Sequence, residues 1–153
     1  MALTILGFGD KAGEYFRMLN PIEHARTKEA AKKYRVEPYV IAADVYSNTN
    51  LAGRGGWTWY TGSSSWFYKV GIENILGFRI QNNTIIISPC IPKEWKEYSI
   101  KYKYQNSIYN IVIKNLEGKN TGVNKFFLDG KEIEDKQIKL QDDNKIYNIE
   151  VIM

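Results

Sequence analysis

The chain has 153 residues, of which 44% are hydrophobic and 25% are charged, and its formal net charge is +4. This composition is sufficient for a globular core, and the lack of a clustered basic arm argues against nucleic-acid binding. A single cysteine, Cys90, excludes an internal disulfide and a thiolate metal site, and no run approaches the ~20 apolar residues of a membrane span. We therefore expect a cytoplasmic protein without a membrane span.

The N-terminal half of the chain is predicted to be helical. Residues 2–6 look like the end of a helix that Gly7 closes, but they are too few to form a helix on their own. Apolar residues then recur at helical spacing over residues 10–19, where Asp10 can cap the N-terminus. We therefore expect the chain to begin within a larger helical element.

Two further helices are predicted in the same half. Thr27 can cap a short polar helix that ends before Glu37-Pro38, and the proline sets an extended entry to residues 39–47. The hydroxyls of Ser63 to Ser65 can cap a helix that Gly77 ends. Because this last helix is apolar on nearly every side, we expect it to be buried.

After residue 80 the pattern changes to short β-branched runs with a period of two. Gln105-Asn106-Ser107 and Asp129-Gly130 are typical of the tight turns of hairpins. The sequence therefore predicts an antiparallel β-sandwich in this half. The predicted strands and hairpin segments cover residues 84–88, 98–104, 108–115, 125–133 and 145–153.

The densest group of unusual residues is GRGGWTWYTGSSSW at positions 53–66. A helix that starts here presents N–H groups without intrahelical partners, the positive end of its dipole and adjacent hydroxyls, which together can bind an anion. Thr61 can donate its hydroxyl to a phosphate oxygen, and Gly62 allows a ligand to approach the backbone closely. The alternative is that these residues are ordinary helix caps.

The tryptophans in this stretch also allow two interpretations. Trp57 and Trp59 alternate in a segment predicted to be extended, so both rings point to one face, where a sugar ring can stack. The alternative is that both rings are packed in the core. Arg54 can bring a fixed positive charge to the same place.

Three runs, RVEPYVIAADVYS, GRGGWTWYTGSSSWFYKVGIENILGFR and ISPCIPKEW, carry a resemblance to a known family. They strongly resemble the C-terminal end of glycoside hydrolase family 94, the inverting disaccharide and oligosaccharide phosphorylases, and above all the β-1,2-glucan-related members. The resemblance covers residues 3–105 and continues weakly beyond them. It implies an α+β chain with the last helices of an (α/α)6 barrel in residues 1–78 and a C-terminal antiparallel β-sandwich in residues 79–153.

The resemblance also implies a reaction and a site. Inorganic phosphate displaces the leaving sugar at the anomeric carbon with inversion while a carboxylic acid protonates the departing oxygen, so phosphate is a co-substrate and no cofactor is expected. Thr61 and Gly62 match the family's phosphate-binding threonine and glycine, and Ser63 is a neighbouring candidate. The candidates for contacts with the sugar are Glu37, Asp44, Arg54, Trp57 and Trp59.

The chain departs from the family pattern in its catalytic residues. The family's acid, an aspartate, and a phosphate-binding histidine precede the segment that matches this chain, so we assign no catalytic residue. His24 does not match that histidine and is interpreted as a surface or capping residue. Cys90 is interpreted as a buried structural thiol. Glu37 and Asp44 can equally be helix caps or ion-pair partners of nearby arginines.

We therefore expect the C-terminal portion of a phosphorylase that acts on a β-glucan oligosaccharide and phosphate, releases glucose 1-phosphate and is inactive alone. Exposed faces of barrel helices would then favour self-association or a complementing N-terminal chain. One alternative is a stand-alone carbohydrate-binding or structural β-domain that binds glycan on Tyr102, Tyr104 or Tyr109. Another is a small hydrolase with two local carboxylates.

Overall fold

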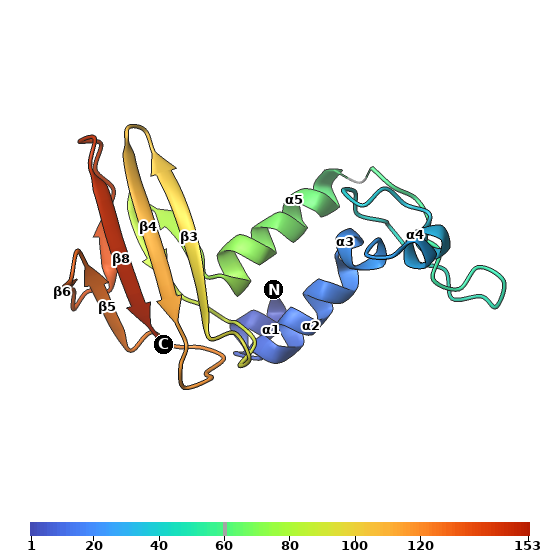
Figure 1. The fold of residues 1–153 in the computed structure, drawn as a ribbon, viewed down its shortest axis with the longest axis horizontal. Coiled ribbons are helices and arrows are strands. Elements are labelled where there is room, and N and C mark those ends of the chain that lie inside the picture. The colour runs from blue at the N-terminus through green and yellow to red at the C-terminus, as the bar shows by residue number, and fades with distance from the viewer. Residues whose placement is uncertain (60) are drawn as a thin grey trace. The chain divides into compact units, whose positions relative to one another are not determined.

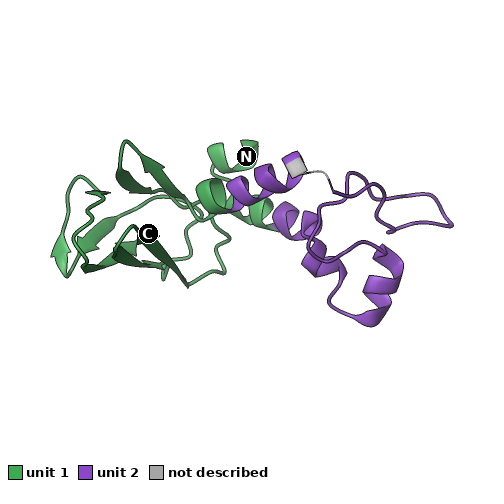
Figure 2. Ribbon diagram, turned by 90° about the horizontal axis from the view of Figure 1, so that it is seen from above, with its two compact units in different colours: residues 1–13, 72–153 green, residues 14–71 purple. Residues whose placement is uncertain are grey.

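The computed structural model describes residues 1–59 and 61–153, without the side chain of Thr61. Contacts divide the chain into two compact units (Figure 2). Unit 1 combines Met1–Gly13 with Ile72–Met153, and unit 2 is Glu14–Gly71. The predicted boundary between residues 78 and 79 stays a prediction.

Unit 1 is built on two β-sheets, which Figure 1 shows as two layers. Its strands are β1 (Phe78–Gln81), β2 (Thr84–Ile87), β3 (Glu97–Tyr104), β4 (Ser107–Lys114), β5 (Lys125–Leu128), β6 (Lys131–Glu132), β7 (Gln137–Lys139) and β8 (Ile146–Ile152). The three-stranded sheet has the order β1-β2-β7, and the five-stranded sheet has the order β3-β4-β8-β5-β6. Mixed helices and sheets with a C-terminal sheet domain are therefore confirmed.

The two predicted hairpins are present, but one feature of the sheet differs from the prediction. β3 pairs with β4 and β5 with β6, both antiparallel, so the turns at residues 105–106 and 129–130 are confirmed. However, β4 pairs with β8 in parallel, with Ile111 opposite Ile149. The prediction of an antiparallel β-sandwich is therefore wrong for this pair of strands, whereas the other described strand pairs are antiparallel. Alternating burial reveals which face of a strand is inside, but not the direction of its neighbour.

The core of unit 1 lies between the sheets. Ile85 of the small sheet and Tyr109 and Ile111 of the large sheet are fully buried. The ring of Phe78 on β1 lies 5.2 Å from the ring of Tyr102 on β3, centroid to centroid. Because Tyr109 is buried and Tyr102 faces Phe78, these two tyrosines are not the exposed glycan-binding aromatics of the alternative prediction. Burial of each large apolar side chain contributes roughly 1.5–3 kcal/mol.

The start of the chain packs on the segment between β2 and β3. Helix α1 (Ala2–Ile5) is followed by Gly7 at φ 78°, as predicted, and helix α2 (Gly9–Leu19) begins soon after. A Cβ on Gly9 would collide with the carbonyl of Ile91, and one on Gly13 would press on the ring of Pro92. These two glycines, one helical turn apart, therefore let the helix backbone contact the prolyl segment directly.

Asp10 has a different role from the one predicted. It lies inside the first turn of α2, and its Oδ1 accepts a hydrogen bond from the backbone N–H of Lys93 at 2.9 Å. That bond lowers the pKa of the Asp10 carboxyl. The prediction that Asp10 caps the helix is therefore wrong, and the carboxylate instead joins α2 to the chain that leads into β3.

Unit 2 contains short helices joined by turns. They are the second part of α2, α3 (Pro21–His24), α4 (Lys28–Tyr34) and α5 (Thr61–Lys69), and a π-helix (Val70–Ile75) follows α5. The cap predicted at Thr27 is confirmed, because its hydroxyl accepts from the N–H of Ala30 at 3.1 Å. Helix α3, whose N-terminus is capped by the side chain of Asn20, is not among the helices predicted from the sequence.

His24 connects three of these helices. Its Nε2 donates to the carbonyl of Met18, near the end of α2, at 2.7 Å. Its ring stacks on the ring of Tyr34 at the end of α4, with 4.5 Å between centroids. The interpretation of His24 as a capping residue agrees with these contacts.

Helix α5 packs through one side only of its predicted apolar surface. Phe67 stacks on Phe16 of α2 with the centroids 4.0 Å apart and 7° between the ring planes. In contrast, Trp66 is 59% exposed and Tyr68 is 71% exposed. The prediction that this helix is buried all round is therefore wrong in this chain, because the elements present cover only the Phe67 side.

Asp143 makes the stability of unit 1 dependent on pH. Its carboxylate binds Lys145 at 2.7 Å and accepts from the hydroxyls of Tyr147 and Ser107, which lowers the pKa of Asp143 to about 2. Such a group stabilises the fold above about pH 4, and the contribution disappears as the pH falls through 2. We expect the difference in melting temperature between the wild type and Asp143→Asn to shrink between pH 4 and pH 2. A difference that stays constant over this range would contradict the assignment.

Candidate functional site

Residues 43–57 form an irregular hairpin in place of the extended segment predicted over residues 39–47. An isolated bridge pairs Val45 with Gly55. The backbone hydrogen bonds between the two arms are Ala43 N–H to Trp57 O at 2.6 Å, Gly56 N–H to Asp44 O at 2.8 Å, Tyr46 N–H to Arg54 O at 2.9 Å and Gly53 N–H to Tyr46 O at 2.8 Å. The hairpin therefore fixes the position of the tryptophan-containing arm.

Two glycines allow this hairpin to close. A Cβ on Gly56 would collide with the carboxylate of Asp44, and a Cβ on Gly55 would collide with Val36. The Asp44 carboxylate accepts a hydrogen bond from the backbone N–H of Trp57 at 3.2 Å. Asp44 therefore positions the backbone of Trp57, a role that the sequence analysis did not consider.

The aromatic side chains of this region lie at the surface. Trp57 is 76% exposed, Trp59 is 64% exposed and Tyr39 is 72% exposed, so the alternative of core packing is wrong for both tryptophans in this chain. The rings of Tyr39 and Trp59 meet edge to face, with 6.2 Å between centroids. Trp59 has φ 65°, which is left-handed and not extended, so the predicted alternation fails at this residue. Tyr39 is not among the residues predicted from the sequence, although it lies in the EPYV run.

The start of α5 is the second part of the candidate site. The helix begins at Thr61, so the first N–H groups, including those of Gly62 and Ser63, have no acceptor within the helix. Both residues are exposed, and no described atom lies within 4 Å of a Cβ built on Gly62. The hydroxyl of Thr61 lies outside the described residues, so its role stays a prediction. Trp59 precedes Thr61 by two residues, so the Cα atoms of these two residues lie within about 7 Å of each other.

Glu37 and Arg54 occupy two other positions in unit 2. Glu37 is half-buried in the turn after α4, where its carbonyl accepts from the N–H of Val40 at 3.3 Å. Arg54 lines a cavity of about 200 Å³ together with residues from the end of α4. Neither is seen in an ion pair with a carboxylate or a guanidinium in the part of the chain that the structure describes. Their predicted contacts with sugar stay predictions.

The Cys90 thiol and the possible metal ligands do not form a further reactive site among the described residues. Cys90 is buried, its N–H donates to the carbonyl of Ile75 at 2.9 Å, and burial raises the pKa of its thiol. Among the described residues, no three His, Cys, Asp or Glu side chains come together as a metal site. The helices in the same part of the chain are too short or too polar to cross a bilayer.

Comparison with known families decides the assignment of the first half. Residues 1–77 match the glycosyl hydrolase 94 superfamily, catalytic domain. The chain belongs to this superfamily. The adjoining residues 78–118 match the glycosyl hydrolase family 65, C-terminal domain. The resemblance to family 94 seen in the sequence is therefore confirmed.

The chain spans a fifth or less of the length of the curated relatives named here. It is 48% identical over 104 residues to the cyclic beta-(1,2)-glucan synthase NdvB of Rhizobium meliloti, a match that covers 68% of the chain and 4% of the synthase. It is 28% identical to the solabiose phosphorylase of Paenibacillus borealis over all of the chain and 20% of that enzyme. It is 29% identical to the N,N'-diacetylchitobiose phosphorylase of Vibrio furnissii over 84% of the chain and 16% of that enzyme.

Proposed function

We propose that the chain is the C-terminal portion of an inverting phosphorylase that acts on a β-glucan oligosaccharide. Residues 1–78 supply the closing helices of an (α/α)6 barrel, and residues 79–153 supply its C-terminal β-domain. A phosphate oxygen attacks the anomeric carbon of a terminal glucosyl unit, the bond to the leaving sugar breaks, and an acid protonates the departing oxygen to give glucose 1-phosphate. Membership of the superfamily and the 48% identity to a β-(1,2)-glucan synthase support this proposal.

The exposed start of α5 carries the proposal. The N–H groups of Gly62 and Ser63, which have no acceptor within the helix, and the positive end of its dipole suit a phosphate ion. No described atom lies within 4 Å of a Cβ on Gly62, so an anion has room to approach the amides there. The hydroxyls of Thr61 and Ser63 add donors to the same ion.

The aromatic side chains beside α5 suit the sugar. Sugar rings stack on flat apolar faces, and the exposed rings of Trp57 and Trp59 offer two of them a few residues before the phosphate-binding turn. In the proposed complex Glu37 and Arg54 bond to sugar hydroxyls. Asp44 accepts from a sugar hydroxyl through Oδ2, because its Oδ1 accepts from the N–H of Trp57.

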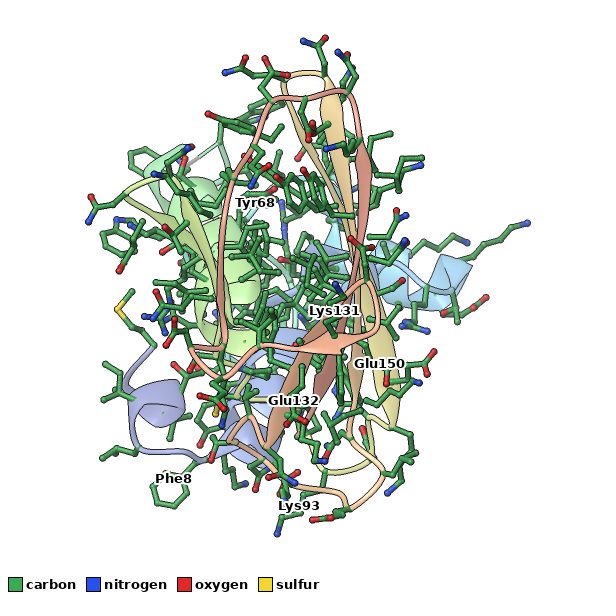
Figure 3. All side chains as sticks on the ribbon, turned by 90° about the vertical axis from the view of Figure 1, so that its left-hand side faces the viewer. Phe8, Tyr68, Lys93, Lys131, Glu132 and Glu150 are labelled. Atoms are coloured by element: carbon green, nitrogen blue, oxygen red, sulfur yellow. The ribbon has the colours of Figure 1, made fainter. Side chains whose placement is uncertain are left out.

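We propose that activity requires residues outside this chain. No carboxylic acid is assigned the role of proton donor, so we propose that the chain alone is inactive. Large apolar side chains are also exposed on α1, on α2 and in the turn between them, among them Ile5 at 76%, Phe8 at 55% and Leu19 at 62%, and the ring of Phe8 projects into solvent in Figure 3. Apolar surface of this kind favours contact with other protein. We propose that the remainder of a barrel, or a second copy, covers it.

Three measurements test this function. In ¹H–¹⁵N spectra of the chain titrated with inorganic phosphate, we expect the amide signals of Gly62 and Ser63 to move. In a chimera, this chain replaces the matching segment of the Paenibacillus solabiose phosphorylase, and we expect phosphate-dependent cleavage of solabiose. The chain alone should release no glucose 1-phosphate from β-1,2-linked glucose oligosaccharides. Immobile Gly62 and Ser63 signals, together with a folded but inactive chimera, would refute the proposal.

A further inference from the structure

Four positively charged side chains surround one cavity in unit 2. Lys32, Lys33 and Arg35 come from the end of α4, and Arg54 comes from the hairpin; the cavity has a volume of about 200 Å³. We call this group the basic pocket. Its remaining lining is small or apolar except for one amide, and consists of Asn50, Leu51 and Ala52.

The end of α4 fixes one side of the basic pocket. Arg35 is the C-cap and adopts a left-handed conformation with φ 55°, and its backbone N–H donates to the carbonyl of Ala31 at 2.9 Å. Its Nε donates to the carbonyl of Lys32 at 3.2 Å. One of the five N–H donors of the guanidinium is thereby anchored, and the remaining donors stay available for a ligand.

The hairpin turn fixes the other side. The side chain of Asn48 accepts from the N–H of Leu51 at 2.9 Å, and the N–H of Arg54 donates to the carbonyl of Leu51 at 2.9 Å. These bonds fold the chain back so that Arg54 reaches the end of α4. Gly53, at φ 86°, completes the turn, and a Cβ at this position would meet Cε of Lys33 at 2.5 Å. The glycine therefore allows the lysine stem to lie against the turn.

The charges in the basic pocket are not balanced by the protein. In the part of the chain that the structure describes, none of the four cations is in an ion pair with a carboxylate. The negative end of the α4 dipole accounts for cations in its last turn. It does not account for Arg54, which belongs to a separate segment and is held close to three like charges at an electrostatic cost.

We propose that the basic pocket binds a small phosphate-bearing molecule of the sugar phosphate class. A phosphate dianion offers several acceptor oxygens to the lysine ammonium groups and to the forked donors of the two arginines. The cavity is several times larger than the roughly 30 Å³ that one water occupies in the liquid, so a phosphate group with an attached ring has room. None of these residues lies at the start of α5, and Arg54 alone is also a proposed sugar contact, so the inference does not require the proposed catalysis.

Titration of the full chain tests the site. Glucose 1-phosphate is added to ¹⁵N-labelled protein at low salt, with inorganic phosphate and glucose in parallel titrations. We expect saturable shifts of the amide signals of residues 32–35 and 50–54 with both phosphates and none with glucose. Raising the salt concentration should weaken binding, because partly exposed charges are screened.

Matched variants separate a specific site from general attraction to a basic protein. Lys33→Gln and Arg54→Gln should each weaken glucose 1-phosphate binding about tenfold, the value of one charge-assisted hydrogen bond. Lys28→Gln removes the same charge from the exposed first turn of α4 and should change the affinity less than about twofold. Equal effects of Lys28→Gln and Lys33→Gln, or shifts confined to Gly62 and Ser63, would overturn the assignment. Shifts confined to the basic pocket would instead leave it intact and contradict the function proposed for α5.

Discussion

Replacing Gly77 with alanine is expected to lower the free energy of unfolding of unit 1 by about 3 kcal/mol. Gly77 has φ 72°, a conformation that side chains other than that of glycine disfavour. A Cβ here would also collide with the carbonyl group of Ser88 and lie 2.4 Å from the backbone nitrogen of Pro89. These atoms belong to the backbone, and the N–H of Ser88 donates to the carbonyl of Gly77 at 2.8 Å, so neither segment can move without losing that bond.

Urea unfolding followed by circular dichroism measures this effect, and Gly130→Ala is the matched control. Gly130 also has positive φ, at 80°, but no described atom lies within 4 Å of a Cβ built on it. The control should therefore lose only about 1 kcal/mol, from backbone strain. If the two variants were equally destabilised, the contact between Gly77 and Ser88 would not contribute, and the close approach of Gly77 to the backbone of Ser88 and Pro89 would be contradicted.

Gly77 also illustrates what the sequence reveals about this fold. Its position after an apolar run was enough to predict a helix end, because that signal is local. The crowding by Ser88 and Pro89 is not local and could not be predicted. The hairpin turns were predicted for the same reason as the helix end, since Asp129-Gly130 has its own turn chemistry. The parallel pairing of β4 with β8 was missed because it joins segments more than thirty residues apart.

The candidate site, too, could be predicted from the sequence only in part. The sequence identified the glycine-rich and tryptophan-rich run, because those residue types are unusual together. It did not reveal the positive φ of Trp59 or the contact of this ring with Tyr39, which depend on the closure of the hairpin. In the sequence Arg54 is an isolated charge, whereas the turn at Gly53 brings it to three cations at the end of α4. The residue types of a site can thus be read from the sequence, whereas their neighbours depend on the fold.

Gly62→Ala is expected to separate function from stability. Since no described atom lies within 4 Å of a Cβ at this position, the added methyl should not strain the fold, and alanine favours a helix over glycine by up to about 1 kcal/mol. The same methyl would occupy the space through which phosphate is proposed to reach the first amides of α5. Loss of such donors to a transition state lowers rates by roughly 10²–10³-fold. We therefore expect kcat/KM of the solabiose phosphorylase chimera to fall about 100-fold, with an unchanged or higher melting temperature of the 153-residue chain.

Phosphorolysis at varied phosphate concentrations, combined with thermal unfolding, measures both quantities. Ser65→Ala, on the same helix but beyond its first turn, serves as the control and should keep kcat/KM within about threefold. A Gly62→Ala chimera with normal activity and an unchanged KM for phosphate would show that the anion does not use these amides. A chimera that loses activity together with its melting temperature would instead make Gly62 a structural glycine. The open space around its Cα argues against that outcome, because a Cβ there would meet no described atom.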